Sequence, residues 1–115
     1  MGDGKAFTEL MNASDDLRKE DLARMLELYG RMLRELDYGP IEYKDTSVLL
    51  GGNMLRGTGK TDALQHAAWM CGEAGRFLKQ GRLYKTARWI GWIQGVLWTS
   101  GVCSLEELRG HNRFM

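Results

Sequence analysis

The stretch over residues 61–100 places apolar and small side chains at helical spacing and is interrupted once, by Gly81. Apolar residues that recur every three or four positions are typical of an amphipathic helix. We predict one helix that begins at residue 61 or 62 and runs to 80, and a second that begins at 82 or 83 and runs to about 100. Gly81 and Gly101 follow these helices, where glycine commonly closes a helix in the left-handed conformation. Two helices joined by so short a turn are expected to pack as an antiparallel hairpin.

Small side chains form a line along each predicted helix. They are Ala67, Ala68, Cys71, Ala74 and Gly75 in the first helix, and Ala87, Gly91, Gly95 and Thr99 in the second. Because a glycine inside a helix costs about 1 kcal/mol relative to alanine, the pattern predicts that a neighbouring backbone comes close to Gly91 and Gly95. Leucine at either glycine is then expected to overfill the contact and disrupt packing. The opposite face of the second helix is broadly apolar (Trp89, Ile90, Ile93, Val96 and Leu97), so both of its sides can be covered.

The region before the hairpin contains one further long helix. Residues 1–13 show no sustained helical periodicity of apolar residues and are expected to form a loose N-terminus. From Ser14 to about Asp37, apolar residues recur at three- and four-residue spacing, with Ser14 as the N-cap and a Gly-Pro pair at 39–40 as the stop. Residues 38–60 hold five glycines and the single proline, which predicts a long connector.

The region after the hairpin carries the signature of a short helix. Ser104 is followed three residues later by Glu107, the spacing of a capping box. The sequence as a whole therefore predicts an all-α fold in a single domain over residues 1–115. Its parts are a long amphipathic helix, a glycine-rich connector, a helical hairpin and a short C-terminal helix.

The composition is that of a globular protein. Hydrophobic residues make up 43% of the 115 residues, and four of the eleven aromatic residues are tryptophan, which excludes an acidic disordered tail. The formal net charge is +1, which excludes a uniformly basic nucleic-acid arm. Charge is nevertheless uneven, since residues 1–45 carry 11 acidic and 7 basic side chains and residues 46–115 carry 4 and 9. The two halves could attract each other, or the second could bind an acidic partner.

Cysteine usage and hydropathy point to a reduced, cytoplasmic protein. The two cysteines, Cys71 and Cys103, form no CxxC motif or regular framework, and no secretory leader is recognised. The longest apolar run, Trp89–Trp98, is ten residues, whereas about 20 are needed to span a bilayer. We expect no membrane span and interpret this run as a core or interface helix.

Three tryptophans are the candidate partner-binding residues. Trp69 projects away from the small side chains of its helix, and Trp92 and Trp98 lie off the main apolar face of theirs. Together with Arg76 they suggest a surface for a second copy of the chain or for another protein. The alternative is that the first helix and the connector cover them. We expect a homo-oligomer, with a foreign protein partner also open.

The segment over residues 51–61, GGNMLRGTGKT, is a candidate anion-binding loop. Its end resembles a phosphate-binding loop, but the required glycine at position 54 is Met54, so nucleotide hydrolysis is not expected. A glycine-rich loop that enters a helix N-terminus can still bind a phosphate through backbone N–H groups. The residues of this alternative site are Arg56, Gly57, Gly59, Lys60 and Thr61.

The remaining chemistry-bearing residues favour no catalytic or metal site. His66 and His111 are the two histidines, and neither belongs to a recognisable catalytic arrangement. The five-residue step from His66 to Cys71 turns about 140° on a helix, which argues against a shared metal. Cys71 is expected to be a packing residue. Basic residues surround the turn at Gly81, but cations are favoured and solvated at a helix C-terminus without any ligand, so nucleic acid is not the expected partner. We expect no enzyme activity and no cofactor.

The segment over residues 88–115, RWIGWIQGVLWTSGVCSLEELRGHNRFM, resembles the ending of small uncharacterised proteins encoded by tailed bacteriophages. The shared pattern is Arg-Trp-x-Gly-x-x-Gln-Gly-x-Leu-Trp followed by a short helix and an Asn-Arg close. Residues 61–78 have a similar character, so the resemblance covers about half of the chain. It implies a phage accessory protein in the bacterial cytoplasm, a class that often binds and inhibits a host or defence protein.

Overall fold

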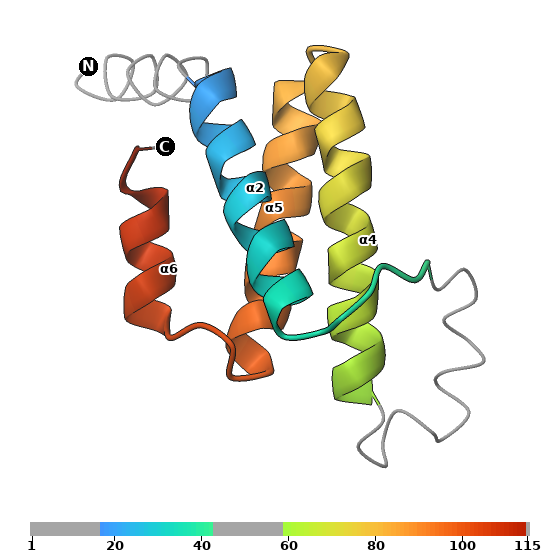
Figure 1. Ribbon diagram of the computed structural model, residues 1–115. Coiled ribbons are helices and arrows are strands. Elements are labelled where there is room, and N and C mark those ends of the chain that lie inside the picture. Colours follow the sequence, from blue (N-terminus) through green and yellow to red (C-terminus); the bar gives the residue numbers. More distant parts are fainter. Residues whose placement is uncertain (1–16, 43–58, 115) are drawn as a thin grey trace.

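The computed structural model describes residues 17–42 and 59–114, and within these ranges it contains helices and no strand (Figure 1). The four α-helices are α2 (Lys19–Glu35), α4 (Gly59–Lys79), α5 (Leu83–Thr99) and α6 (Leu105–His111). A short 3-10 helix, η2 (Asn112–Phe114), continues α6. The expectation of an all-α fold is confirmed. None of the described helices is long and apolar enough to cross a membrane.

The hairpin of α4 and α5 forms as predicted, and its turn shows why. Gly81 adopts φ 77°, the left-handed conformation that glycine tolerates best. The N–H of Gly81 donates to the carbonyl of Leu78 and that of Arg82 to the carbonyl of Phe77, which is the Schellman pattern. Gly101, at φ 79°, closes α5 in the same way. Both predicted helix ends therefore lie within one residue of the observed ones.

The first described helix differs from its prediction at both ends. Arg18 is extended and α2 begins at Lys19, so no helix runs unbroken from residue 14; Ser14 itself lies outside the described residues. At the other end, Asp37 takes φ 68° and its N–H donates to the carbonyl of Arg34. The chain thus turns at an aspartate two residues before the predicted glycine, because the apolar periodicity that holds α2 on the core has ended there.

The predicted connector is shorter than expected at its C-terminal end, and its N-terminal end is held against the core. Gly59 and Lys60, which the sequence pattern places in it, form the first turn of α4. On the other side, Tyr38 is half-buried, and the N–H of Ile41 donates to the carbonyl of Gln65 at 3.1 Å. The chain after α2 is therefore fastened to α4. Residues 1–16 and 43–58, including the predicted loose N-terminus, lie outside the described residues.

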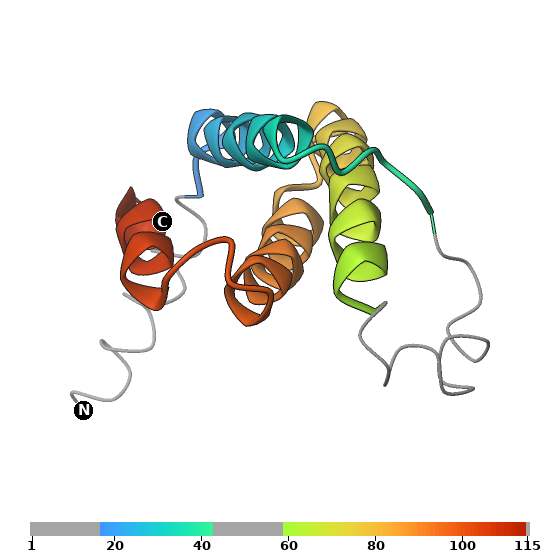
Figure 2. The ribbon, with the colours of Figure 1, turned by 60° about the horizontal axis from the view of Figure 1, so that its bottom comes forward.

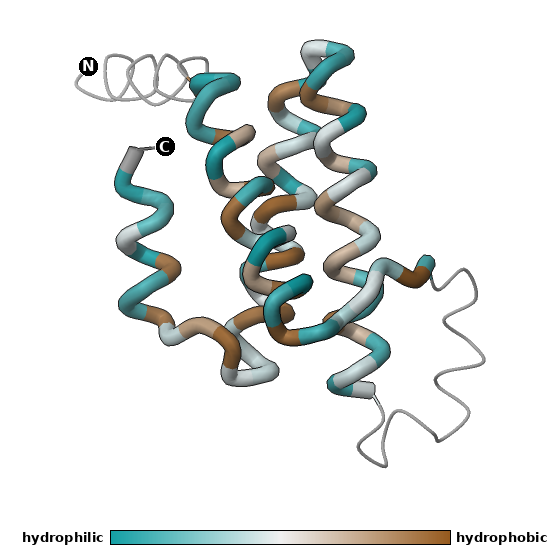
Figure 3. The backbone as a smooth tube through the Cα atoms, in the orientation of Figure 1, coloured by the Kyte–Doolittle hydropathy of each residue, from teal (hydrophilic) through white to brown (hydrophobic). Residues whose placement is uncertain are grey.

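One apolar core joins the three longer helices. α2 lies across both members of the α4–α5 hairpin, as Figure 2 shows. The fully buried apolar side chains come from all three helices: Leu22, Tyr29, Leu33, Leu64, Ala67, Ala74, Ile90, Ile93 and Leu97. In Figure 3, α2 and α6 alternate between hydrophilic and hydrophobic positions, as expected of helices with one buried side.

The expected close approach at the α5 glycines is wrong. Gly91 and Gly95 are exposed, and a Cβ atom at either would meet no described atom within 4 Å. The buried side of α5 is instead its large apolar face, because Ile90, Ile93 and Leu97 bury far more surface than a glycine stripe can. Among the described residues, small side chains instead come close between α2 and α4, where a Cβ atom on Gly30 would be 4.0 Å from the Cβ of Cys71.

The short C-terminal helix has the predicted cap. Ser104 Oγ accepts from the backbone N–H of Glu107 at 3.1 Å, and Glu107 Oε1 accepts from the N–H of Ser104 at 2.8 Å. Both halves of the capping box are therefore present. Leu108 is the buried residue of this helix, so α6 contributes little apolar surface to the core.

Candidate partner-binding surfaces

Trp69 is less exposed than its predicted role requires. It lies half-buried on α4, with its ring stacked on His66 at a centroid distance of 5.2 Å and an interplanar angle of 25°. Trp89 of α5 tilts against its other side at 6.1 Å. The sequence suggested a ring projecting into solvent, but neighbouring aromatic rings give it partial cover. Trp69 is thus both a packing residue and a rim residue of a groove.

The structure brings two of the predicted tryptophans together and separates the third. Trp92 meets His66 edge-on at 6.0 Å, so Trp69 and Trp92 flank one histidine on the α4–α5 seam. Trp98 lies six residues beyond Trp92, which is about 120° around the helix. Trp92 is 54% exposed and Trp98 52% exposed. The expectation that these two side chains lack full shelter is confirmed for the described part of the chain.

The basic residues near the hairpin turn interact largely with the protein itself. Lys85 Nζ lies 4.3 Å from the ring centroid of Phe77, and the Arg82 guanidinium lies 5.4 Å from it. Arg76, a predicted partner-binding residue, pairs with Glu73 at 3.4 Å and is exposed. These contacts are worth little at a solvated surface. They hold the cations at the turn without requiring a ligand.

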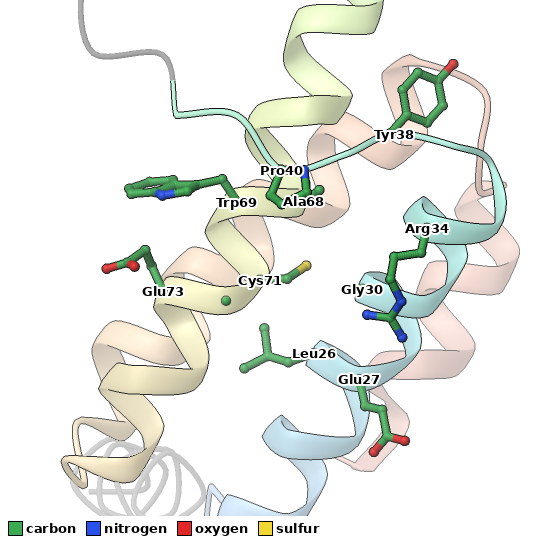
Figure 4. A pocket seen from close by; sticks show the side chains of 11 residues that line it. Leu26, Glu27, Gly30, Arg34, Tyr38, Pro40, Ala68, Trp69, Cys71 and Glu73 are labelled. Atoms are coloured by element: carbon green, nitrogen blue, oxygen red, sulfur yellow. The ribbon is translucent and has the colours of Figure 1, made fainter.

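An open groove lies between α2 and α4 and has a volume of about 540 Å³. Its floor is built from small or apolar residues, among them Gly30, Ala68 and Cys71. Figure 4 shows Trp69 on one side and Arg34 on the other, with the Cys71 sulfur between them. Arg34 has no ion pair among the described residues. The groove therefore combines an aromatic rim, a shallow apolar floor and one available cation.

The thiols at this groove and near α6 are poor nucleophiles. Burial raises the pKa of the Cys71 thiol to about 12, although the Arg34 guanidinium lowers it in part. Burial likewise raises the pKa of Cys103. Since the thiolate is the reactive form, both residues are packing groups, as predicted for Cys71. Among the described residues, no three His, Cys, Asp or Glu side chains are grouped so as to hold a metal ion.

Only part of the candidate anion site can be placed. Arg56 and Gly57 lie outside the described residues, whereas Gly59, Lys60 and Thr61 form the start of α4. Lys60 and Gly59 line a cavity of about 340 Å³ against the end of α5, with Ala63, Val96, Thr99 and Ser100. Asp62 lies in the same first turn. Its carboxylate already supplies negative charge to this helix end and would compete with an anionic ligand.

A partly buried polar network was missed by the sequence analysis. Gln94 Nε2 donates to the Tyr29 hydroxyl at 2.8 Å and to Asn112 Oδ1 at 2.9 Å, and Asn112 Nδ2 returns a bond to Gln94 Oε1 at 3.2 Å. Tyr29 Oη also lies 2.8 Å from His111 Nδ1. The available signal was Gln94, a polar residue on the same helix face as Ile90 and Leu97.

Tyr29 is the residue that links the members of this network. Its oxygen accepts from Gln94, and the same oxygen lies at hydrogen-bond distance from Nδ1 of His111. Burial raises the pKa of Tyr29, and the bond from Gln94 lowers it in part, so the phenol stays protonated. This network joins α2, α5 and the end of α6.

Comparison with known proteins leaves the site to be argued from its own geometry. The chain matches no family model, no curated protein and no solved structure.

Proposed function

We propose that this chain is a non-enzymatic protein-binding module whose α2–α4 groove receives one amphipathic helix of a partner protein. The observation that carries the proposal is the groove floor. Gly30, Ala68 and Gly72 carry almost no side chain, so the backbone of a partner helix can come close. Trp69 on the rim offers the large, rigid contact that anchors many interfaces.

The charges around the groove define the partner's chemistry further. Arg34 is exposed and without an ion pair among the described residues, whereas Glu73 on the opposite wall is paired with Arg76. A partner helix with an acidic residue beside its apolar face would satisfy Arg34. Desolvation by the partner would strengthen this pair relative to a solvated one. Glu27 also lines the groove, is exposed and has no ion pair among the described residues. We therefore expect the partner helix to be amphipathic, with an acidic residue opposite Arg34 and a basic residue opposite Glu27.

The phage-like pattern in residues 88–98 supports a bacterial source for this partner. On that basis the finer proposal is an accessory protein that binds, and inhibits or modulates, a host or defence protein in the bacterial cytoplasm. The buried, protonated thiols, and the contact of His111 with the buried Tyr29, support a binding role rather than a catalytic one. Nothing in this proposal requires a cofactor.

Gly72→Leu tests the groove directly. Gly72 is exposed, and a Cβ atom there meets no described atom within 4 Å, so leucine fills the groove without straining the fold. Immobilised wild-type chain is expected to retain a bacterial protein that the variant retains at least about tenfold less. Gly110→Leu, the same change on α6, is the matched control, because a Cβ atom there also meets no described atom within 4 Å, and it is expected to retain the partner. Equal retention by Gly72→Leu and wild type would contradict the proposal.

The alternative function is nucleotide or oligonucleotide binding at the start of α4. The cavity of about 340 Å³ beside Lys60 is the observation that favours it. Lys60→Ala is expected to abolish binding of a nucleoside triphosphate or of a short single-stranded oligonucleotide, measured by titration calorimetry at two salt concentrations. Absence of binding by the wild-type chain would eliminate this alternative, while leaving the groove proposal intact.

A further inference from the structure

The outer side of α5 is a helix face that the described chain leaves open. α2, α4 and α6 surround α5 on its remaining sides (Figure 2). We define the outer α5 face by Tyr84, Arg88, Gly91, Gly95 and Trp98, which fall within about 80° of one another at 100° per residue. All five are exposed, and Trp92 lies at the edge of this face. A tryptophan that is 52% exposed beside a flat glycine surface indicates a place where another helix packs.

The charge along this helix is polarised. α5 contains no acidic residue, and its cations, Lys85 and Arg88, lie in its first two turns. Its second half carries no charged side chain and ends in the negative pole of the helix. Arg88 has no ion pair among the described residues. In an antiparallel pair of these helices, the cationic first half of one α5 therefore lies beside the uncharged second half and negative pole of the other.

The positions on this face are also symmetric about one point. Gly91 and Gly95 lie two residues on either side of position 93, and Arg88 and Trp98 lie five residues on either side of it. A two-fold axis at position 93 thus places each of these residues level with its counterpart on an antiparallel copy. A parallel arrangement would instead put arginine against arginine.

We propose that two copies of this chain pack their outer α5 faces antiparallel about a two-fold axis at position 93, with Arg88 level with the partner's Trp98. The glycines let the two helix axes approach closely, as packed helices with small contact residues do. An arginine over a tryptophan ring is a favourable cation–π arrangement. This arrangement explains both why no described part of the chain packs on Gly91 and Gly95 and why Trp98 is exposed. This surface is separate from the α2–α4 groove, so the two proposals can fail independently.

Gly95→Leu separates this interface from the fold. A Cβ atom at Gly95 meets no described atom, and leucine is the better helix former, so the folded chain is expected to keep or raise its melting temperature. The same leucine blocks close approach of a second α5. Sedimentation equilibrium over a concentration series is expected to show a dimer for wild type and a dissociation constant raised at least about tenfold for the variant. A monomeric wild type at every concentration would overturn the proposal.

A residue swap tests the pairing itself. Trp98→Arg alone places arginine level with arginine at both ends of the interface and is expected to weaken the dimer at least about tenfold. Adding Arg88→Trp restores an arginine level with a tryptophan at both ends, so dimerisation is expected to recover. Lys79→Glu, a charge reversal outside the face, is the control and leaves the dimer unchanged. A dimer that neither Trp98→Arg nor Gly95→Leu weakens would place the interface elsewhere and overturn the proposal.

Discussion

Gln94 Nε2 of α5 donates to the hydroxyl of Tyr29 of α2 at 2.8 Å, with the tyrosine fully buried and the glutamine 8% exposed. This bond is the centre of the network that also reaches His111 and Asn112. Since α6 buries only Leu108 of its own residues, the network is the main polar attachment of the C-terminus to the rest of the protein. A single hydroxyl therefore connects three parts of the chain.

Tyr29→Phe tests this attachment. Loss of the hydroxyl leaves one Gln94 donor and the Nδ1 atom of His111 without their partner, which we expect to lower the free energy of unfolding by about 1–3 kcal/mol. Urea denaturation measures the change, and amide exchange is expected to accelerate in α6. Tyr38→Phe is the matched control, because the Tyr38 hydroxyl makes no hydrogen bond among the described residues and its loss is expected to be nearly neutral. Equal effects of the two changes would refute the structural role of the network.

The left-handed turns predict opposite effects of two substitutions. Asp37 is strained at φ 68°, so Asp37→Gly is expected to stabilise the chain by about 0.5–1 kcal/mol. Gly81 at φ 77° has open space around it, so Gly81→Ala is expected to cost about 1 kcal/mol from backbone conformation alone. Thermal and urea unfolding of both variants measure these shifts. A stabilising Gly81→Ala would be inconsistent with the observed turn.

Alkaline pH is expected to destabilise the chain through Cys71. Its thiol has an ordinary pKa of 9.0 and a pKa of about 12 when folded, because burial disfavours the thiolate. Above pH 9 the unfolded chain ionises first, so this contribution is complete below pH 9 and is lost as the pH rises toward 12. The urea midpoint is therefore expected to fall between about pH 8 and about pH 10.5.

Cys71→Ala identifies the source of that pH dependence. The variant loses some packing at neutral pH, but its decline at alkaline pH is expected to be shallower than that of wild type. Part of the decline remains, because burial also raises the pKa of Tyr29 above its ordinary value of 10.0. Identical slopes in the two proteins would show that Cys71 is not the titrating group.

The capping box predicts a local effect in α6. Ser104→Ala removes the acceptor for the Glu107 N–H and is expected to cost about 1 kcal/mol, seen as faster amide exchange within α6. Hydrogen bonds from Ser104 hold the pKa of Glu107 below its usual range, so the box is complete at neutral pH and weakens as the pH falls through that lowered value. Glu107→Gln is expected to remove this acid dependence. Unchanged exchange in Ser104→Ala would show that packing of Leu108 alone holds the helix.

The helices and most of their ends could be predicted from sequence because their physics is local. A glycine at position 81 or 101 closes a helix whatever lies beyond it, and the Ser104–Glu107 box is complete within four residues. Prediction failed where the turn residue was unusual. Asp37, rather than the glycine two residues later, takes the left-handed conformation, since the end of the apolar pattern of α2 decides the turn.

The candidate site depended much more on tertiary structure. The sequence identified Trp69, Trp92 and Trp98 as residues without obvious shelter, but only the packing of α4 on α5 showed that Trp89 partly covers Trp69 while Trp98 stays exposed. The groove between α2 and α4 had no sequence signal, because its floor is defined by the approach of Gly30 to Cys71. A helix face made of small residues can either pack against a neighbour or stay open, so the sequence alone does not distinguish the two.

By itself the sequence determined that this protein is helical, where its hairpin turns and how its last helix begins, because these features depend on neighbouring residues. Only the tertiary structure decided which side of α5 is buried and which polar groups meet in the core. Ile90, Ile93 and Leu97 compete with the glycine face for the same neighbours, and the side that buries more apolar surface wins. Tyr29 and His111 are 82 residues apart, and packing of their helices on one core brings them into contact.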